Sequence, residues 1–110
     1  MSDLVRNLKI KGIDKVIDVD VKITDPTLER GSWFCRYEIG WPEGAKTGEA
    51  WGADAIQAVQ LTMQAIALRL YGSSYHAERS LYWQKPGKGY GFPLPKNLAD
   101  EHIGDDKDTF

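Results

Sequence analysis

Few residues of this chain are of the types that bind metals or act as nucleophiles. His76 and His102 are the only histidines and stand far apart in the sequence, whereas zinc ligands recur in pairs a few positions apart. Cys35 alternates with large apolar residues, which predicts a strand with this side chain directed inward as a small buried hydrophobe. We therefore expect structural roles for all three residues, and neither a metal nor another cofactor.

Two aspartates come closer to a catalytic arrangement. Asp18 and Asp20 are two positions apart in an alternating segment, so both side chains point to the same face of a strand and could act as a carboxylate pair. Lys22 continues the same row, and Arg36 and Glu38 can lie across from it. Cross-strand ion pairs on a solvated face explain this pattern without catalysis, and this is the interpretation that we prefer.

The segment from Lys85 to Gly91 has the lysines and glycines of a phosphate-binding loop. The glycine loops that bind nucleotides lie after a strand, and a helix begins directly after them. Here Phe92-Pro93 follows, which cannot begin that helix. The segment therefore predicts an ordinary loop.

Aromatic residues form a further candidate site, which consists of Trp33, Tyr37, Trp41 and Trp51. Aromatic side chains dominate small-molecule pockets, so these residues could line a ligand groove. They also serve as core beneath a helix, which is the commoner use. An aromatic sheet can stack on single-stranded nucleic acid, but a net charge of −2 supplies too little positive charge for that partner.

Length and composition define the class of protein. A chain of 110 residues with 42% hydrophobic and 27% charged residues is typical of one globular domain. A single cysteine excludes an internal disulfide. The longest apolar stretch, 53–71, is interrupted by polar side chains, which argues against a membrane span. Residues 1–6 do not resemble a signal peptide, so we expect a cytoplasmic protein.

Acidic residues gather near the end of the sequence. Residues 100–110 hold five carboxylates against the single lysine Lys107. Such a charge run is typical of a solvated segment. We expect residues 1–99 to form a single α+β domain and residues 100–110 to form a flexible acidic tail.

Alternation of apolar and polar residues predicts strands at 4–11, 15–23, 32–41 and 47–51. Short turns separate them, which favours an antiparallel meander because parallel strands need a long crossover. Residues 78–83 are a candidate for a short fifth strand, and an irregular C-terminal segment follows.

The periodicity changes after Gly52. Asp54 and Gln57 form a capping-box pattern, and apolar residues then recur at helical spacing until Gly72, which can end the helix. The stripe expected to lie on the sheet consists of Ile56, Val59, Met63, Ile66 and Leu70. The sequence thus predicts an α+β fold, a four-strand antiparallel meander packed on one long helix over 54–71.

The same helix carries a second apolar strip, which consists of Ala58, Leu61, Ala65 and Leu68. These residues fall within about 80° of one another at about 100° per residue. A helix that faces water on its back should be polar there. Three interpretations stay open: a C-terminal segment with Tyr90, Phe92 and Leu94 covers the strip, a second copy of the chain packs on it, or a different protein docks on it.

The helix start resembles that of a known family. The residues Gly52-Ala53-Asp54-Ala55-Ile56-Gln57-Ala58-Val59-Gln60-Leu61, with Gly91-Phe92-Pro93 downstream, are similar to a group of small bacterial proteins labelled as domains of unknown function. That group shares a Gly-x-Asp-x-x-Gln-Ala-x-x-Leu helix start after several strands, and a late Gly-x-Pro. The resemblance implies a bacterial origin and a strands-then-helix layout, but it implies no activity, substrate or catalytic residue.

These observations favour a binding function over catalysis. We expect a non-enzymatic protein-interaction or accessory domain that uses the surface of helix 54–71, with a second copy or another protein as its partner. The alternative is a small-molecule binding domain that uses the aromatic sheet face.

Overall fold

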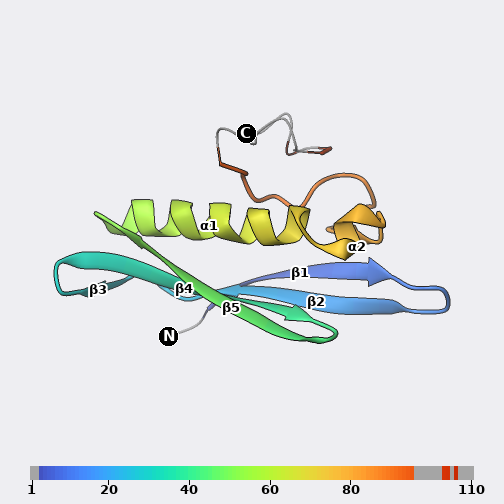
Figure 1. Cartoon of the computed structure of the whole chain (residues 1–110), viewed down its shortest axis with the longest axis horizontal. Coiled ribbons are helices and arrows are strands. Elements are labelled where there is room, and N and C mark those ends of the chain that lie inside the picture. Colours follow the sequence, from blue (N-terminus) through green and yellow to red (C-terminus); the bar gives the residue numbers. More distant parts are fainter. Residues whose placement is uncertain (1–2, 96–102, 105, 107–110) are drawn as a thin grey trace.

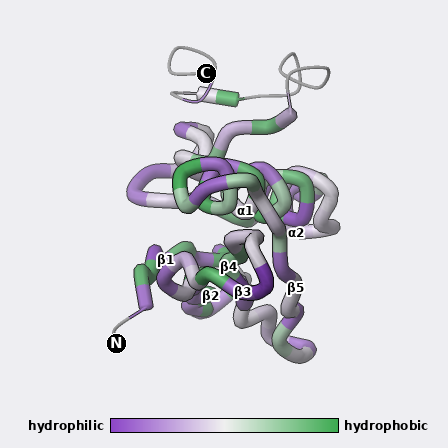
Figure 2. Tube along the Cα trace, turned by 90° about the vertical axis from the view of Figure 1, so that its left-hand side faces the viewer, coloured by the Kyte–Doolittle hydropathy of each residue, from purple (hydrophilic) through white to green (hydrophobic). Residues whose placement is uncertain are grey.

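The computed structural model describes residues 3–95, 103, 104 and 106 (Figure 1). Over these residues five strands precede two helices, and a short strand follows them. The elements are β1 (Leu4–Lys11), β2 (Val16–Ile23), β3 (Thr27–Glu29), β4 (Ser32–Trp41), β5 (Gly44–Gly52), α1 (Ala55–Tyr71), α2 (Ser74–Ala77) and β6 (Leu81–Tyr82). The strands form one sheet and α1 covers one of its faces, which gives two layers (Figure 2). The predicted α+β class is confirmed.

The long strands form the predicted antiparallel meander. β1 pairs with β2, β2 with β4, and β4 with β5. β6 pairs with the other edge of β1 at Lys9 and Ile10, so it is the short fifth strand expected within 78–83. Short turns between successive strands account for this order, because antiparallel neighbours need no crossover.

The short strand β3 continues the line of β2 along the same edge of β4. Between β2 and β3, Pro26 has no N–H to donate to a ladder, and the Thr24 hydroxyl accepts from the Arg36 N–H at 2.9 Å. The chain returns to β4 through Arg30 and Gly31, which both have positive φ, as a two-residue hairpin turn of this type requires. The sequence pattern did not predict β3 because the proline ends the alternation.

One face of the sheet and the underside of α1 form the core. The buried strand residues of this core are Leu8, Ile10, Val19, Val21, Ile23, Cys35, Tyr37, Ile39 and Leu81. Apolar burial of this kind is the main favourable contribution to folding, at roughly 25 cal/mol per Å². The prediction that Cys35 is a small buried side chain is confirmed.

Both ends of α1 are capped as predicted. The Asp54 carboxylate accepts from the Gln57 N–H at 2.7 Å, and the Gln57 side chain accepts from the Ala53 N–H at 2.6 Å. At the other end, the Gly72 N–H donates to the Leu68 carbonyl. These bonds satisfy groups that a helix leaves unpaired at its ends.

The face of α1 that meets the sheet differs from the expected stripe. Ile66 and Leu70 are buried, Val59 and Met63 are half-buried, and Ile56 is 77% exposed. Thr62 is buried in the core, because its hydroxyl donates to the Ala58 carbonyl at 2.8 Å and is satisfied within the helix. Apolar periodicity does not reveal a polar side chain that is satisfied in this way.

The helix α1 runs antiparallel along β5. At its start, the helix backbone lies so close to Gly52 that no side chain fits there. Towards its end, Arg69 Nε donates to the Tyr37 hydroxyl at 3.3 Å, and the Tyr37 ring covers Gly48. Beyond the helix, Tyr75 of α2 donates to a carboxylate in the turn between β4 and β5. Of the strands, α1 contacts β4 and β5 most extensively.

The C-terminal segment folds back on the domain. The side chains of Tyr90, Phe92 and Leu94 are buried. The Tyr90 ring packs edge-on against Tyr71, with centroids 5.0 Å apart. The segment therefore belongs to the core that the helix and sheet begin.

Candidate functional site

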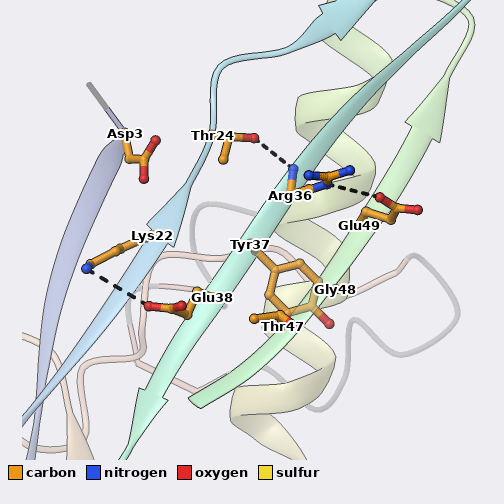
Figure 3. A pocket seen from close by; sticks show the side chains of 9 residues that line it. All are labelled: Asp3, Lys22, Thr24, Arg36, Tyr37, Glu38, Thr47, Gly48 and Glu49. Carbon is orange, nitrogen blue, oxygen red and sulfur yellow. Dashed lines mark hydrogen bonds and ion pairs between the residues drawn. The ribbon is translucent and has the colours of Figure 1, made fainter. Parts of the chain in front are cut away.

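The open face of the sheet, opposite α1, has a hollow of about 490 Å³ with charged walls (Figure 3). Its lining consists of Asp3, Lys22, Thr24, Arg36, Tyr37, Glu38, Thr47, Gly48 and Glu49. Lys22 Nζ lies 4.0 Å from Glu38 Oε2, and Arg36 Nε lies 3.4 Å from Glu49 Oε2. Opposite charges that already face one another do not form a site for an anion or for a cation.

The aspartate pair lies on the same open face. Asp18 accepts from Lys9 at 2.6 Å, and Asp20 accepts from Asn7 at 2.8 Å. The hydrogen bond from Lys9 lowers the pKa of Asp18 below its usual value, so this carboxylate is a poor proton acceptor at neutral pH. Asp18 and Asp20 thus have cross-strand partners, but these are Lys9 and Asn7 of β1 and not the expected Arg36 or Glu38. Such pairing accounts for the pattern without catalysis.

The aromatic candidates lie on two faces of the sheet. Trp33, Tyr37 and Trp41 belong to the face beneath α1, where they pack with the core. Trp51 lies on the open face, opposite Phe34 in register, with ring centroids 4.7 Å apart and 44% of the residue exposed. The candidates therefore do not line one groove.

A buried carboxylate near the C-terminus, Asp106, joins separate parts of the chain. It is 2% exposed and accepts from the Tyr71 hydroxyl at 2.6 Å, the Tyr90 N–H at 3.1 Å and the Gly91 N–H at 2.9 Å. Burial of a carboxylate is costly unless hydrogen bonds satisfy it, and these donors do so. Most of the expected acidic tail lies outside the described residues, but Asp106 is held inside instead of being solvated.

The glycine-rich segment 85–91 packs around this carboxylate. Gly89 and Gly91 have positive φ, and an added Cβ would collide with Asp106 in the first case and with the Arg6 guanidinium in the second. Arg6 also donates to the Gly91 carbonyl at 2.9 Å and stacks on the Trp83 ring at 4.0 Å. These glycines therefore serve close packing within the domain, in keeping with the predicted loop.

The tyrosines beside Asp106 are held in their neutral form. Burial, together with the nearby Asp106 carboxylate, raises the pKa of Tyr71 and the pKa of Tyr90 well above the usual value. His76 Nδ1 lies 2.5 Å from the Tyr90 hydroxyl. A hydroxyl with a raised pKa stays protonated at neutral pH and donates hydrogen bonds instead of acting as a base. The cluster thus stabilises the fold.

A cavity of about 450 Å³ adjoins the cluster, lined by His76, Ala77, Arg79, Leu81, Gly87, Tyr90 and Ile103. Nucleophilic catalysis needs a hydroxyl, thiol, amine or carboxylate activated by a neighbouring base. In this lining the groups of that kind are the Tyr90 hydroxyl, which is buried, and the His76 imidazole beside it. Among the described residues, no group of three His, Cys, Asp or Glu side chains could hold a metal ion.

One flank of α1 borders an apolar groove of about 620 Å³. We call it the Ile56 groove, and its lining consists of Pro26, Ala55, Ile56, Val59, Gln60, Met63, Gln64 and Pro93. None of these side chains is charged, and Ile56 is the most exposed large apolar residue of the helix. The sequence pattern did not reveal this groove because it placed the same helix residues against the sheet.

The opposite flank of α1 carries three of the four predicted interface residues. Leu61 and Leu68 are 37% and 43% exposed, and Ala65 is half-buried. Ala58 does not belong to this surface, because it is fully buried where the helix approaches Gly52. We call Leu61, Ala65 and Leu68 the Leu61 strip.

The Leu61 strip borders β5. Leu68 shares the lining of a small hollow with Trp41 of β4 and Lys46 of β5. The C-terminal segment lies on the other flank, where Phe92 shares a hollow with Met63. The segment therefore folds back, as the first interpretation of the strip states, but it leaves Leu61 and Leu68 exposed.

Comparison with known proteins identifies the family. The family described as Domain of unknown function (DUF6968) matches residues 4–94, so the chain belongs to that family. The predicted resemblance to a family of unknown function is confirmed. No curated protein and no solved structure matches the chain significantly. Over the part of the chain that is described, no helix is long and apolar enough to cross a membrane.

Proposed function

We propose that this family member is a non-enzymatic, cytoplasmic protein-interaction domain that binds an apolar helix of another protein in the Ile56 groove. The observation that carries the proposal is the 77% exposure of Ile56 beside an uncharged groove of about 620 Å³. Apolar patches with polar rims mark interaction sites, because their exposure to water has no benefit for the folded monomer.

The lining of the groove specifies the chemistry of the partner. Ile56, Val59 and Met63 provide the apolar floor on one flank of α1, and Gln60 and Gln64 provide uncharged polar groups beside it. A charged side chain inserted here would lose its hydration without an opposite charge to compensate. The partner therefore presents large uncharged side chains.

The groove walls favour a helix over an extended strand as the partner. Strand addition needs a row of free N–H and C=O groups. The backbone groups of α1 are bonded within the helix, and Pro26 and Pro93 have no N–H. An amphipathic helix needs no such groups, because its apolar side chains enter a groove directly.

A small-molecule site is less well supported. Such sites enclose roughly 70–90% of the ligand and direct several polar groups at it. The Ile56 groove lies on an exposed flank, and the glutamines Gln60 and Gln64 are its only polar side chains. The expected aromatic groove is not assembled, because Trp51 lies on the opposite face of the sheet from the other candidates.

The proposal can be tested with a display library of helical peptides in which positions i, i+3, i+4 and i+7 are randomised. We expect selected peptides to carry large uncharged apolar residues at those positions. Their dissociation constants should rise at least about tenfold for Ile56→Glu, since the partner would have to desolvate a charge. Leu61→Glu is the matched control on the other flank and should bind as the native chain does.

Circular dichroism and urea unfolding establish that both variants fold. A library that yields no enriched family would contradict the proposal. Selected peptides that bind Ile56→Glu with unchanged affinity would also contradict it, because the bound helix would then lie elsewhere.

A further inference from the structure

The strand β5 is an edge of the sheet with no neighbour on its outer side among the described residues. The Thr24 N–H donates to the Arg36 carbonyl, so the even-numbered residues of β4 direct their backbone groups towards β2. Because bonding directions alternate along an antiparallel strand, the odd-numbered residues of β4 bond to the even-numbered residues of β5. The outward backbone groups of β5 therefore belong to Ala45, Thr47, Glu49 and Trp51.

This edge lacks two of the usual protections against pairing, a proline and a bulge. Natural edge strands are short, or are interrupted by proline, bulges or charged side chains that point inward. β5 has nine residues and no proline, and it pairs with β4 without a bulge. Of its two charged residues, Glu49 lies 3.4 Å from Arg36 on the open face, and Lys46 lies on the face covered by α1, where it lines a hollow with Leu68. No described residue pairs with the outer edge of β5, so its outward backbone groups can accept another strand.

We infer that β5 of a second copy of this chain pairs with this edge, antiparallel about a two-fold axis at Gly48. In that register Thr47 lies opposite Glu49 of the second copy, and Ala45 lies opposite Trp51. Every outward residue of both strands then has a partner. The four resulting residue pairs exchange two hydrogen bonds each, which gives about eight hydrogen bonds in all. A shift of the axis to Glu49 would place two carboxylates opposite one another, and a shift to Thr47 would leave Trp51 outside the paired set.

The position of α1 agrees with this arrangement. Strands lie about 4.8 Å apart in a sheet, so in the dimer β5 lies about 2.4 Å and β4 about 7.2 Å from the axis. A helix over both strands would lie about 5 Å from the axis, and the two helices would be about 10 Å apart. Packed helices are separated by about 8–10 Å. The extended sheet would therefore bring the two α1 helices into contact.

The surfaces that would meet are the two Leu61 strips. The two-fold axis passes at Gly48, which the Tyr37 ring covers, and Arg69 of α1 donates to the Tyr37 hydroxyl. The helix turn before Arg69, which includes Ala65, therefore lies close to the axis. Two antiparallel helices centred there place Leu61 of one copy near Leu68 of the other. The small Ala65 side chain permits close approach.

A stable dimer requires a contact of substantial area. Specific interfaces bury roughly 800 Å² per partner, which is a small part of the 7013 Å² accessible surface of this chain. A nine-residue strand edge and one flank of a helix can supply that area. The Ile56 groove lies on the other flank and stays open, so this inference is independent of the proposed function.

Amide hydrogen exchange, followed residue by residue by NMR, tests the inference directly. In the dimer, the amides of Ala45, Thr47, Glu49 and Trp51 should exchange as slowly as those of Lys46 and Gly48, which bond to β4. Light scattering should give twice the chain mass of 12.4 kDa at the same concentration. A 12.4 kDa species at the highest soluble concentration would overturn the inference, as would a dimer whose four outward amides exchange rapidly.

A proline at an outward position separates edge pairing from other modes of association. Thr47→Pro removes an N–H that faces away from β4, a position where edge strands tolerate proline, and should raise the dimer dissociation constant at least about tenfold. Thr47→Val, which keeps the N–H, should dimerise as the native chain does. If Thr47→Pro folds and dimerises with native affinity, the inference fails. If it does not fold, the exchange pattern of the native chain decides.

Discussion

The Tyr71 hydroxyl donates to the Asp106 carboxylate at 2.6 Å, across 35 positions of the chain. This bond ties the end of α1 to the C-terminal residues, and the same carboxylate accepts from Tyr90 and Gly91 in the glycine-rich segment. The two flanks of α1 therefore differ. One is closed in part by a segment that this carboxylate anchors, and the other is left exposed beside the free edge of β5.

Replacement of the anchoring carboxylate should weaken the fold. Asp106→Asn keeps the shape of the side chain but places an NH2 group where one of its hydrogen-bond acceptors was, so a buried donor loses its partner. We expect the free energy of unfolding, measured in urea, to fall by about 1–3 kcal/mol. Asp14→Asn, at an exposed turn, is the control and should change it by less than about 0.5 kcal/mol. Equal effects of the two substitutions would contradict the role of Asp106.

Stability should decline at alkaline pH because of the tyrosines beside Asp106. Burial raises the pKa of Tyr71 in the folded chain, so the folded state holds that proton more tightly than the unfolded state. The resulting stabilisation is complete below about pH 10, the usual tyrosine pKa, and is lost as the pH rises further. Tyr71→Phe has no such proton, so the stability difference between the native chain and this variant should narrow above about pH 10. A difference that stays constant from about pH 8 to pH 11 would contradict this assignment.

Two glycines of the same loop should differ in their tolerance of a side chain. Gly87 and Gly91 both have positive φ, but a Cβ meets nothing at Gly87, whereas at Gly91 it meets Arg6 and Trp83. Gly87→Ala should therefore cost only the backbone strain, about 1 kcal/mol. Gly91→Ala should cost at least about 1 kcal/mol more, because packed groups must move. Urea unfolding of the pair measures the difference, and equal costs would show that the contact at Gly91 is unimportant.

Local sequence signals predicted the elements of the fold well. Alternation identified β1, β2 and β4, but only residues 47–51 of β5, which spans Gly44–Gly52. The caps at Asp54 and Gly72 identified both ends of α1, because each cap depends on neighbouring residues alone. The face of the sheet on which Trp51 lies is instead decided by the register of β5 against β4. β5 contains few large apolar residues, so its own alternation did not reveal that register.

The contacts that shape the candidate site join distant parts of the chain. Asp106 lies in an acidic run that is typical of a solvated segment. Its burial is explained by the hydrogen bonds that Tyr71, Tyr90 and Gly91 donate to its carboxylate. Ile56 fits the apolar stripe of α1 by spacing, yet the chain leaves it exposed. Periodicity indicates which residues are apolar, but the position of the helix on the sheet decides which of them are buried.

The central claim is that the exposed apolar flank of α1 serves binding and is not needed for folding. The most direct test is the free energy of urea unfolding of Ile56→Gln beside that of Ile66→Gln, a substitution in the same helix at a buried position. We predict a change of less than about 0.5 kcal/mol for Ile56→Gln and a loss of more than about 3 kcal/mol for Ile66→Gln. If Ile56→Gln also loses more than about 2 kcal/mol, as a core residue would, the flank is part of the core and the claim is wrong.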